Sequence, residues 1–187
     1  MIGLGADHGG YKLKEEIKKY LDERNLKYID YGTYDEERTD YPIYARKVVE
    51  SVQSGECDKG ILICGTGFGM TIIANKFKGI RCASCWNEDV ARLFKEHNNG
   101  NVISLPGRFI DSSQAIKILD AWLDSEFMAG RHTERLQMIE NIENEFMNKW
   151  GISYVGRYSN CFYYCFSYNV YDNTSYYEIS KKNRCTW

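Results

Sequence analysis

The sequence lacks several features that mark membrane, secreted or nucleic-acid-binding proteins. No apolar run approaches the length that a helix needs to span a bilayer. The net charge is −2, so there is no overall bias toward nucleic acid or a membrane surface, and any anion site must be local. The first residues have neither the basic segment nor the long apolar run of a signal peptide. We therefore expect a cytoplasmic protein without a nucleic-acid or membrane partner.

Three ligand-binding signatures are also missing. Cys82 and Cys85 have the spacing of zinc ligands, but no second pair at finger-like spacing accompanies them, so we expect no metal site. The glycine-rich loop at residues 65–69 does not end in the Gly-Lys-Ser/Thr of a nucleotide-binding P-loop. Its glycine spacing also differs from that of a dinucleotide-binding loop. These differences disfavour a nucleotide-binding regulator.

The first 144 residues alternate between predicted strands and helices. Strands are predicted at residues 2–6, 26–30, 59–64, 80–84 and 101–105. Helices are predicted at residues 11–24, from Pro42 onward, at 69–76, 87–97 and 111–124, and from 133 onward. This alternation predicts an α/β fold, a three-layer sandwich in which helices cover both faces of a five-stranded parallel sheet.

Candidate polar residues follow these strands. Asp7 and His8 follow the first strand, Cys64 ends the third, and Arg108 comes shortly after the fifth. Ligands of parallel α/β sheets bind beyond the carboxyl ends of the strands. We therefore expect these residues to converge on one edge of the sheet, together with His97, which closes a helix.

Cys64 stands between a buried strand and the glycines of the following loop. A thiol near a helix N-terminus is more easily deprotonated, which makes it a usable base or nucleophile. The backbone amides of the loop suit a phosphate or an oxyanion that develops during a reaction. Thr66 adds a hydroxyl two residues after the thiol. The structural alternative is a small buried cysteine that only ends a strand.

Arg131 and Arg135 lie four residues apart, on one face at the start of the last predicted helix. Cations at a helix N-terminus oppose the helix dipole, so their placement suggests an external dianion such as phosphate. A solvated charged face is the alternative. Asp7 or His8 could likewise cap the N-terminus of a helix. His97 and Asn98 could form the C-terminal cap of a helix that is followed by a turn.

The ordered set of motifs resembles ribose-5-phosphate isomerases of the B type, in the ribose/galactose-6-phosphate isomerase family. The motifs are Asp7-His8-Gly9, the loop from Cys64 to Met70, Ala74-Asn75-Lys76, His97-Asn98-Asn99-x-Asn101 and Arg131-x-x-x-Arg135. The resemblance implies a Rossmann-like domain that isomerises a pentose phosphate through an enediolate, without metal or organic cofactor, in the pentose phosphate pathway. It also implies a homodimer, or a dimer of dimers, whose active sites are completed by the neighbouring subunit.

The resemblance also implies residue roles. By position, Cys64 corresponds to the base that moves the proton between C1 and C2. Some members of the family use a glutamate of the next helix instead; residues 74–76 contain no acid here, which favours Cys64. Thr66 and the amides of the loop hold the enediolate oxygens, while His97 assists ring opening. The loop residues in this role are Gly65, Gly67, Phe68 and Gly69. Asp7 and Asn98 contact the sugar, and the phosphate is held by His8, Arg108, Arg131 and Arg135.

Two alternatives remain open at this point. The substrate could be a six-carbon sugar phosphate, such as galactose 6-phosphate or allose 6-phosphate. A non-catalytic sugar-phosphate-binding protein is disfavoured because Cys64, Thr66 and His97 are all present. Residues 1–144 form the predicted isomerase domain. Residues 145–187 contain eight of the fifteen tyrosines and no leucine or alanine, and we interpret them as an extension without a role in the chemistry. The alternative is an aromatic interaction segment.

Overall fold

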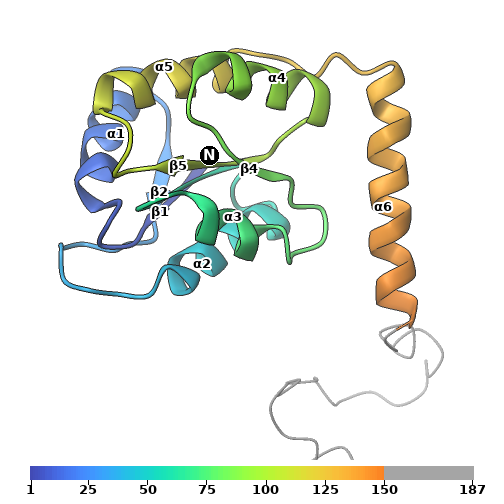
Figure 1. Cartoon of the computed structure of the whole chain (residues 1–187), viewed down its shortest axis with the longest axis horizontal. Coiled ribbons are helices and arrows are strands. Elements are labelled where there is room, and N and C mark those ends of the chain that lie inside the picture. Colours follow the sequence, from blue (N-terminus) through green and yellow to red (C-terminus); the bar gives the residue numbers. More distant parts are fainter. Residues whose placement is uncertain (150–187) are drawn as a thin grey trace, which may run out of the picture. The chain divides into compact units, whose positions relative to one another are not determined.

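The structure, a computed structural model, describes residues 1–149, with side chains up to residue 146. A five-stranded parallel sheet has the strand order β2-β1-β3-β5-β4 (Figure 1). The strands are β1 (Ile2–Ala6), β2 (Tyr28–Asp30), β3 (Lys59–Cys64), β4 (Cys82–Ser84) and β5 (Val102–Pro106). The helices are α1 (Tyr11–Glu23), α2 (Tyr41–Ser54), α3 (Phe68–Ala74), α4 (Glu88–Asn98), α5 (Ser112–Leu123) and α6 (Arg131–Lys149). The predicted α/β fold with five parallel strands is confirmed.

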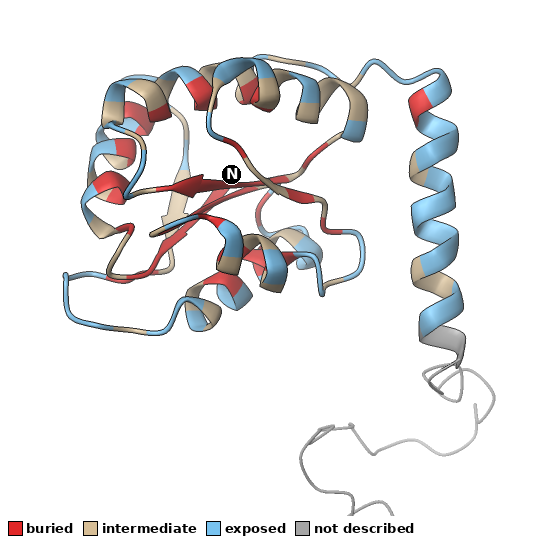
Figure 2. Cartoon of the chain, viewed as in Figure 1, coloured by how far each residue is buried: buried red, intermediate tan, exposed pale blue. Residues whose placement is uncertain are grey.

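Two helical layers cover the sheet, as predicted. Helices α1, α4 and α5 lie on one face, and α2 and α3 lie on the other (Figure 1). The first layer packs through a core that includes Ile17 of α1 and the fully buried Trp122 of α5. The second packs through Val48 of α2 and Met70 of α3. Figure 2 shows the buried residues concentrated along the strands between the two layers, which is why their sequences are apolar on both faces.

A buried ion pair attaches α1 to β2. The side chain of Lys14 is fully buried, and its Nζ lies 2.6 Å from Oδ2 and 2.7 Å from Oδ1 of Asp30. Burial alone would raise the pKa of the Asp30 carboxyl. Hydrogen bonds from Lys14 and from the Gly32 backbone N–H outweigh it, so the pKa lies below its usual value. The charged carboxylate therefore stabilises the folded state.

Helix α4 ends at the edge of the sheet from which β5 starts. Because β5 is parallel to its neighbours, this is the edge formed by the amino ends of the strands. His97, in the last turn of α4, therefore lies away from the carboxyl edge. The expectation that His97 joins Asp7 and Cys64 at one edge was wrong within a single chain. It was wrong because a helix that follows a strand starts, but does not end, at the carboxyl edge.

Helix α6 runs through the predicted domain boundary at residue 144 and ends at Lys149. Glu143 accepts a hydrogen bond from the Gly79 backbone N–H, and the Asn144 side chain accepts one from Lys78. Of the predicted extension, residues 150–187 lie outside the described residues. No helix within residues 1–149 is both long and apolar enough to cross a membrane.

Candidate active site

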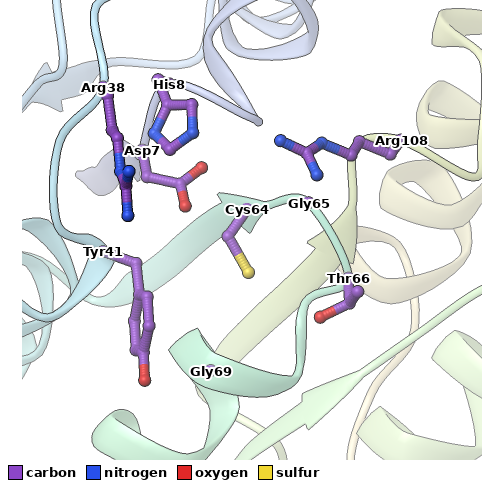
Figure 3. A pocket seen from close by; sticks show the side chains of 9 residues that line it. All are labelled: Asp7, His8, Arg38, Tyr41, Cys64, Gly65, Thr66, Gly69 and Arg108. Carbon is purple, nitrogen blue, oxygen red and sulfur yellow. The ribbon is translucent and has the colours of Figure 1, made fainter.

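A pocket of about 390 Å³ opens at the carboxyl edge of the sheet, beyond the ends of β1, β3 and β5 (Figure 3). Seven predicted site residues line it: Asp7, His8, Cys64, Gly65, Thr66, Gly69 and Arg108. Two further lining residues, Arg38 and Tyr41, were not predicted. The carboxyl edge of the parallel sheet thus brings together predicted site residues that are up to 101 positions apart in the sequence.

Cys64 is the last residue of β3, and its side chain points into the pocket (Figure 3). The backbone N–H of Gly67 donates a hydrogen bond to Sγ of Cys64 at 3.1 Å. Gly67 has a φ of 77°, and any Cβ at this position would collide with the Ser84 hydroxyl. The Gly67 carbonyl accepts a 2.7 Å hydrogen bond from Ser104. The loop is therefore fixed around the thiol.

The remaining loop residues divide between the pocket and its surroundings. Thr66 lines the pocket, and its hydroxyl oxygen accepts a long hydrogen bond of 3.4 Å from the Phe68 N–H. Gly67 and Phe68 do not line the pocket, and the Phe68 side chain is 63% exposed. Because the Gly67 N–H is engaged by Cys64, it is not free to bind a substrate oxygen in this arrangement. Gly65 and Gly69 remain as the lining glycines.

Asp7 shapes the turn between β1 and α1. Its Oδ1 accepts hydrogen bonds from the backbone N–H groups of Gly9 at 2.8 Å and Gly10 at 3.1 Å. Within the described residues, no hydrogen bond engages Oδ2, which leaves one carboxylate oxygen for a ligand. Burial raises the pKa of the Asp7 carboxyl, although His8, the two amides and Arg108 oppose this. The residue is not the cap of α1, whose N-cap is Gly10 without a side-chain bond.

The His8 ring is held by Thr39, from the segment that precedes α2. Its Nδ1 lies 3.1 Å from the Thr39 carbonyl oxygen and 3.3 Å from the Thr39 backbone nitrogen. Without a proton, Nδ1 accepts from this N–H; with a proton, it donates to the carbonyl. A partner is thus present in either protonation state, which keeps the ring oriented and leaves Nε2 for a ligand. Thr39 is itself hydrogen-bonded to the Tyr44 hydroxyl at 2.9 Å.

Tyr41 forms one wall of the pocket beside the glycine loop (Figure 3). Its ring lies so close to Gly69 that a Cβ there would come within 2.8 Å of two ring atoms. The sequence carried a signal for this side of the site that we did not use. Arg38 and Tyr41 follow β2 and precede α2, so they too lie at the carboxyl end of a parallel strand.

The other predicted residues form a second group, which does not line the pocket: His97 and Asn98 at the end of α4, and Arg131 and Arg135 at the start of α6. The rings of His97 and His132 stack with their centroids 4.4 Å apart. The Met128 N–H donates to the Glu96 carbonyl at 2.9 Å, which attaches the segment before α6 to α4. A single chain therefore carries two separate groups of predicted site residues.

Neither a metal site nor an alternative base emerges in the described part of the chain. No three His, Cys, Asp or Glu side chains within it gather in an arrangement that could hold a metal ion. Burial raises the pKa of both Cys82 and Cys85 to about 12, which disfavours the thiolates that bind zinc. The Asn75 amide hydrogen-bonds to both backbone groups of Cys82 and joins α3 to β4, so it has a structural role.

Comparisons with known proteins agree with this architecture. The sequence profile of the family described as Ribose/Galactose Isomerase matches residues 2–139. Ribose-5-phosphate isomerase B of Escherichia coli (strain K12) is 47% identical over 142 residues, which are 76% of this chain and 95% of the relative. Ribose-5-phosphate isomerase B of Clostridium thermocellum superposes with a TM-score of 0.76 at 49% identity, covering 78% of this chain and 98% of that chain. The same enzyme of Mycoplasma genitalium, with bound ribulose 5-phosphate, gives a TM-score of 0.74 at 39% identity, covering 77% and 96%.

Proposed function

Because the chain belongs to the ribose/galactose isomerase family, we propose that it interconverts ribose 5-phosphate and ribulose 5-phosphate. The observation that carries this proposal is that the Cys64 thiol, the Thr66 hydroxyl and the basic side chains of His8 and Arg108 belong to residues that line the same pocket. A base, donors that stabilise an oxyanion and a phosphate-binding group are the parts needed to isomerise a sugar phosphate through an enediolate.

The geometry supports a proton transfer by Cys64. As the thiolate, Cys64 removes the proton from C2 of the open-chain aldose, and the C2–H electron pair forms the double bond of an enediolate. The carbonyl electrons of C1 move onto O1. The hydroxyl proton of O2 is then transferred to O1, the O2 electrons form the C2 carbonyl, and the thiol returns its proton to C1. This gives the ketose and regenerates the thiolate. A carbon acid of this kind is weak, so the developing oxyanion needs preorganised donors. We assign this role to the Thr66 hydroxyl and to the amides of Gly65 and Gly69, because these three residues line the pocket.

The remaining lining residues position the substrate. Oδ2 of Asp7 binds a sugar hydroxyl, while Nε2 of His8 and the Arg108 guanidinium bind the phosphate. These contacts are remote from C1 and C2, and their binding energy places the reacting carbons at Cys64.

We further propose a homodimer in which the partner subunit supplies the second group of residues to each pocket. In this assembly the partner's His97 assists ring opening, and the partner's Asn98, Arg131 and Arg135 contact the sugar and its phosphate. The proposal is supported by the separation of the two groups within one chain. It is also supported by an exposed apolar face of α6, formed by Ile139, Ile142 and Phe146. A dimer of dimers would preserve the same shared sites.

A coupled isomerase assay on five- and six-carbon aldose phosphates tests the reaction. We expect the highest kcat/KM with ribose 5-phosphate. A higher kcat/KM with allose 6-phosphate or galactose 6-phosphate would favour the six-carbon alternative. Binding of these phosphates without turnover of any of them would show a non-catalytic sugar-phosphate-binding protein.

Mixing two impaired variants tests the shared site, provided that the assay uses a ribose 5-phosphate concentration well below KM, so that a loss of phosphate binding lowers the rate. In a symmetric dimer, Cys64→Ala and Arg135→Ala chains that exchange form heterodimers with one intact pocket, and equimolar mixing restores about a quarter of the wild-type activity. Mixing Cys64→Ala with Thr66→Val is the control, because both changes lie in the same group and no intact pocket forms. Equal activity of the two mixtures would show that one chain supplies the whole site.

We also propose that the protein acts in the cytoplasm. The cysteines of the described part of the chain, at positions 57, 64, 82 and 85, are free and buried, as in proteins of reducing compartments. Cell fractionation with an antibody against the protein is the direct test.

A further inference from the structure

The arginines of the described chain fall into two groups according to their partners. One group donates to carboxylates or backbone carbonyls of the chain: Arg24, Arg46, Arg81 and Arg92. The other group has no ion pair and no side-chain hydrogen bond among the side chains described, those of residues 1–146: Arg38, Arg108, Arg131 and Arg135. The last three are predicted phosphate-binding residues, whereas nothing in the sequence assigned a role to Arg38.

Arg38 lines the pocket (Figure 3). In this view its guanidinium lies on the other side of Asp7 and Cys64 from Arg108, with His8 between the two arginines. Asp7 is the acidic residue of the lining, and its Oδ1 is already bonded to the amides of Gly9 and Gly10. Basic groups therefore outnumber the acid around the pocket, which suits a dianionic ligand.

The structure also shows how Arg38 is held at this place. The next residue, Thr39, is hydrogen-bonded through its backbone to the His8 ring and through its hydroxyl to Tyr44 of α2. Tyr41, three residues after Arg38, packs on Gly69 of the glycine-rich loop. The segment that carries Arg38 is thus attached to the pocket by the residues that immediately follow it.

From these observations, we propose that Arg38 is a further phosphate-binding residue of the pocket, contributed by the same chain as Cys64. Its planar guanidinium donates to the substrate phosphate from the side opposite Arg108, with Nε2 of His8 between them. A guanidinium binds two phosphate oxygens at once, which a lysine ammonium cannot do with the same geometry. This inference rests on the proposed function, because it assigns Arg38 to the substrate of that site.

The test uses the full-length protein and the variants Arg38→Ala, Arg38→Lys and Arg46→Ala. Arg46 is the matched control, because it is an exposed arginine of the neighbouring helix that pairs with Glu50 and does not line the pocket. Inorganic phosphate is the probe, measured by titration calorimetry and as a competitive inhibitor of isomerisation. We expect Arg38→Ala to weaken phosphate binding about tenfold or more, as for the loss of a hydrogen bond to a charged group.

The kinetic constants give a second readout. Because the phosphate is remote from C1 and C2, Arg38→Ala should raise KM for ribose 5-phosphate and leave kcat nearly unchanged. Arg38→Lys keeps the positive charge but lacks the planar guanidinium that binds two phosphate oxygens, so we expect a loss of phosphate affinity smaller than that of Arg38→Ala. If Arg38→Ala does not fold, the phosphate affinity and the KM of Arg38→Lys test whether Arg38 contacts the phosphate. Arg46→Ala should match the wild-type protein in every measurement.

Phosphate affinity of Arg38→Ala equal to that of Arg46→Ala would overturn the proposal. So would wild-type affinity of Arg38→Lys combined with an Arg38→Ala defect that disappears at high salt, because this pattern indicates long-range attraction without contact. Calorimetry with phosphate does not require turnover. A wild-type protein that fails to isomerise ribose 5-phosphate would therefore refute the proposed function, while the Arg38 variants would still report on the phosphate contact.

Discussion

The imidazole rings of His97 and His132 lie nearly parallel, with an interplanar angle of 10° and a centroid separation of 4.4 Å. This contact joins the last turn of α4 to the first turn of α6. It therefore places the predicted ring-opening histidine beside Arg131 and Arg135, although 34 residues separate His97 from Arg131 in the sequence. The group that the proposed partner subunit receives is thus assembled within one chain before any dimer forms.

The first prediction concerns the protonation of His132, whose ring stacks on that of His97. Burial lowers the pKa of His132, and positive charge on His97, Arg131 and Arg135 lowers it further. Because the folded-state pKa is depressed, the folded protein disfavours the imidazolium, and protonation at acid pH weakens the stack. We expect NMR titration of His132 to give a midpoint below the ordinary histidine value of 6.5. His97→Ala should raise this midpoint by removing a positive neighbour and exposing the ring. A midpoint above 6.5 in the wild-type protein would contradict the arrangement.

The proposed base is tested by Cys64→Ala. A positioned general base contributes about 10²–10⁴-fold to a rate, so we expect kcat to fall by this order while the sugar phosphate still binds. Cys57→Ala is the matched control, because Cys57 is also a buried free thiol and does not line the pocket. Near wild-type kcat in Cys64→Ala would show that another group removes the C2 proton.

Much of the fold and most of the residues that line the pocket could be predicted from the sequence. The strands β1, β3 and β5 are buried on both faces, so their continuous apolar sequences were enough to predict them as strands. Asp7, Cys64 and Arg108 then followed from the rule for parallel sheets. The position of His97 could not be derived in this way, because it lies at the end of α4 and not at the carboxyl end of a strand; in the dimer that we propose, it serves the pocket of the other subunit. Arg38 was missed because the same rule was not applied to the segment between β2 and α2.

Asp7 illustrates a residue whose placement opposes stability. Its folded-state pKa is raised, chiefly by burial, so the folded protein is penalised at every pH above both the unfolded and the folded pKa. Asp7→Asn removes the buried charge and keeps an oxygen that can accept from Gly9 and Gly10. We expect a higher melting temperature at pH 7 together with a lower kcat/KM. The gain in melting temperature should vanish as the pH falls below the ordinary aspartate pKa of 3.8, because the carboxyl is then neutral in both states. A lower melting temperature of Asp7→Asn at pH 7 would contradict this interpretation.

The charge of Asp30, in contrast to that of Asp7, stabilises the folded protein. Its folded-state pKa is lowered, so its carboxylate stabilises the protein above the unfolded pKa, and this stability is lost as the pH falls through the folded pKa. Asp30→Asn leaves the ammonium of Lys14 buried without its main partner, and we expect a loss of about 3–5 kcal/mol in the free energy of unfolding at pH 7. Glu16→Gln, which breaks the exposed pair with Lys19, should change little. Denaturant unfolding of both variants at pH 7 and pH 3 makes the comparison; equal losses in the two variants would refute it.

The last prediction concerns the residues beyond α6. The Escherichia coli relative aligns over 95% of its own length with only 76% of this chain, and the family profile ends at residue 139. The contacts of Glu143 and Asn144 with the loop at Lys78 and Gly79 lie before the end of α6. A chain that ends at Lys149 keeps the pocket, the stacked histidines, both arginines of α6 and these contacts. We therefore expect it to retain the kcat, the KM for ribose 5-phosphate and the oligomeric state of the full chain, measured by the coupled assay and by sedimentation.

A chain that ends at Arg135 is the matched comparison, because it removes most of α6 and should lose the oligomer and the activity. A shortened chain ending at Lys149 that folds but is inactive or monomeric would show that residues 150–187 belong to the site or to the subunit interface.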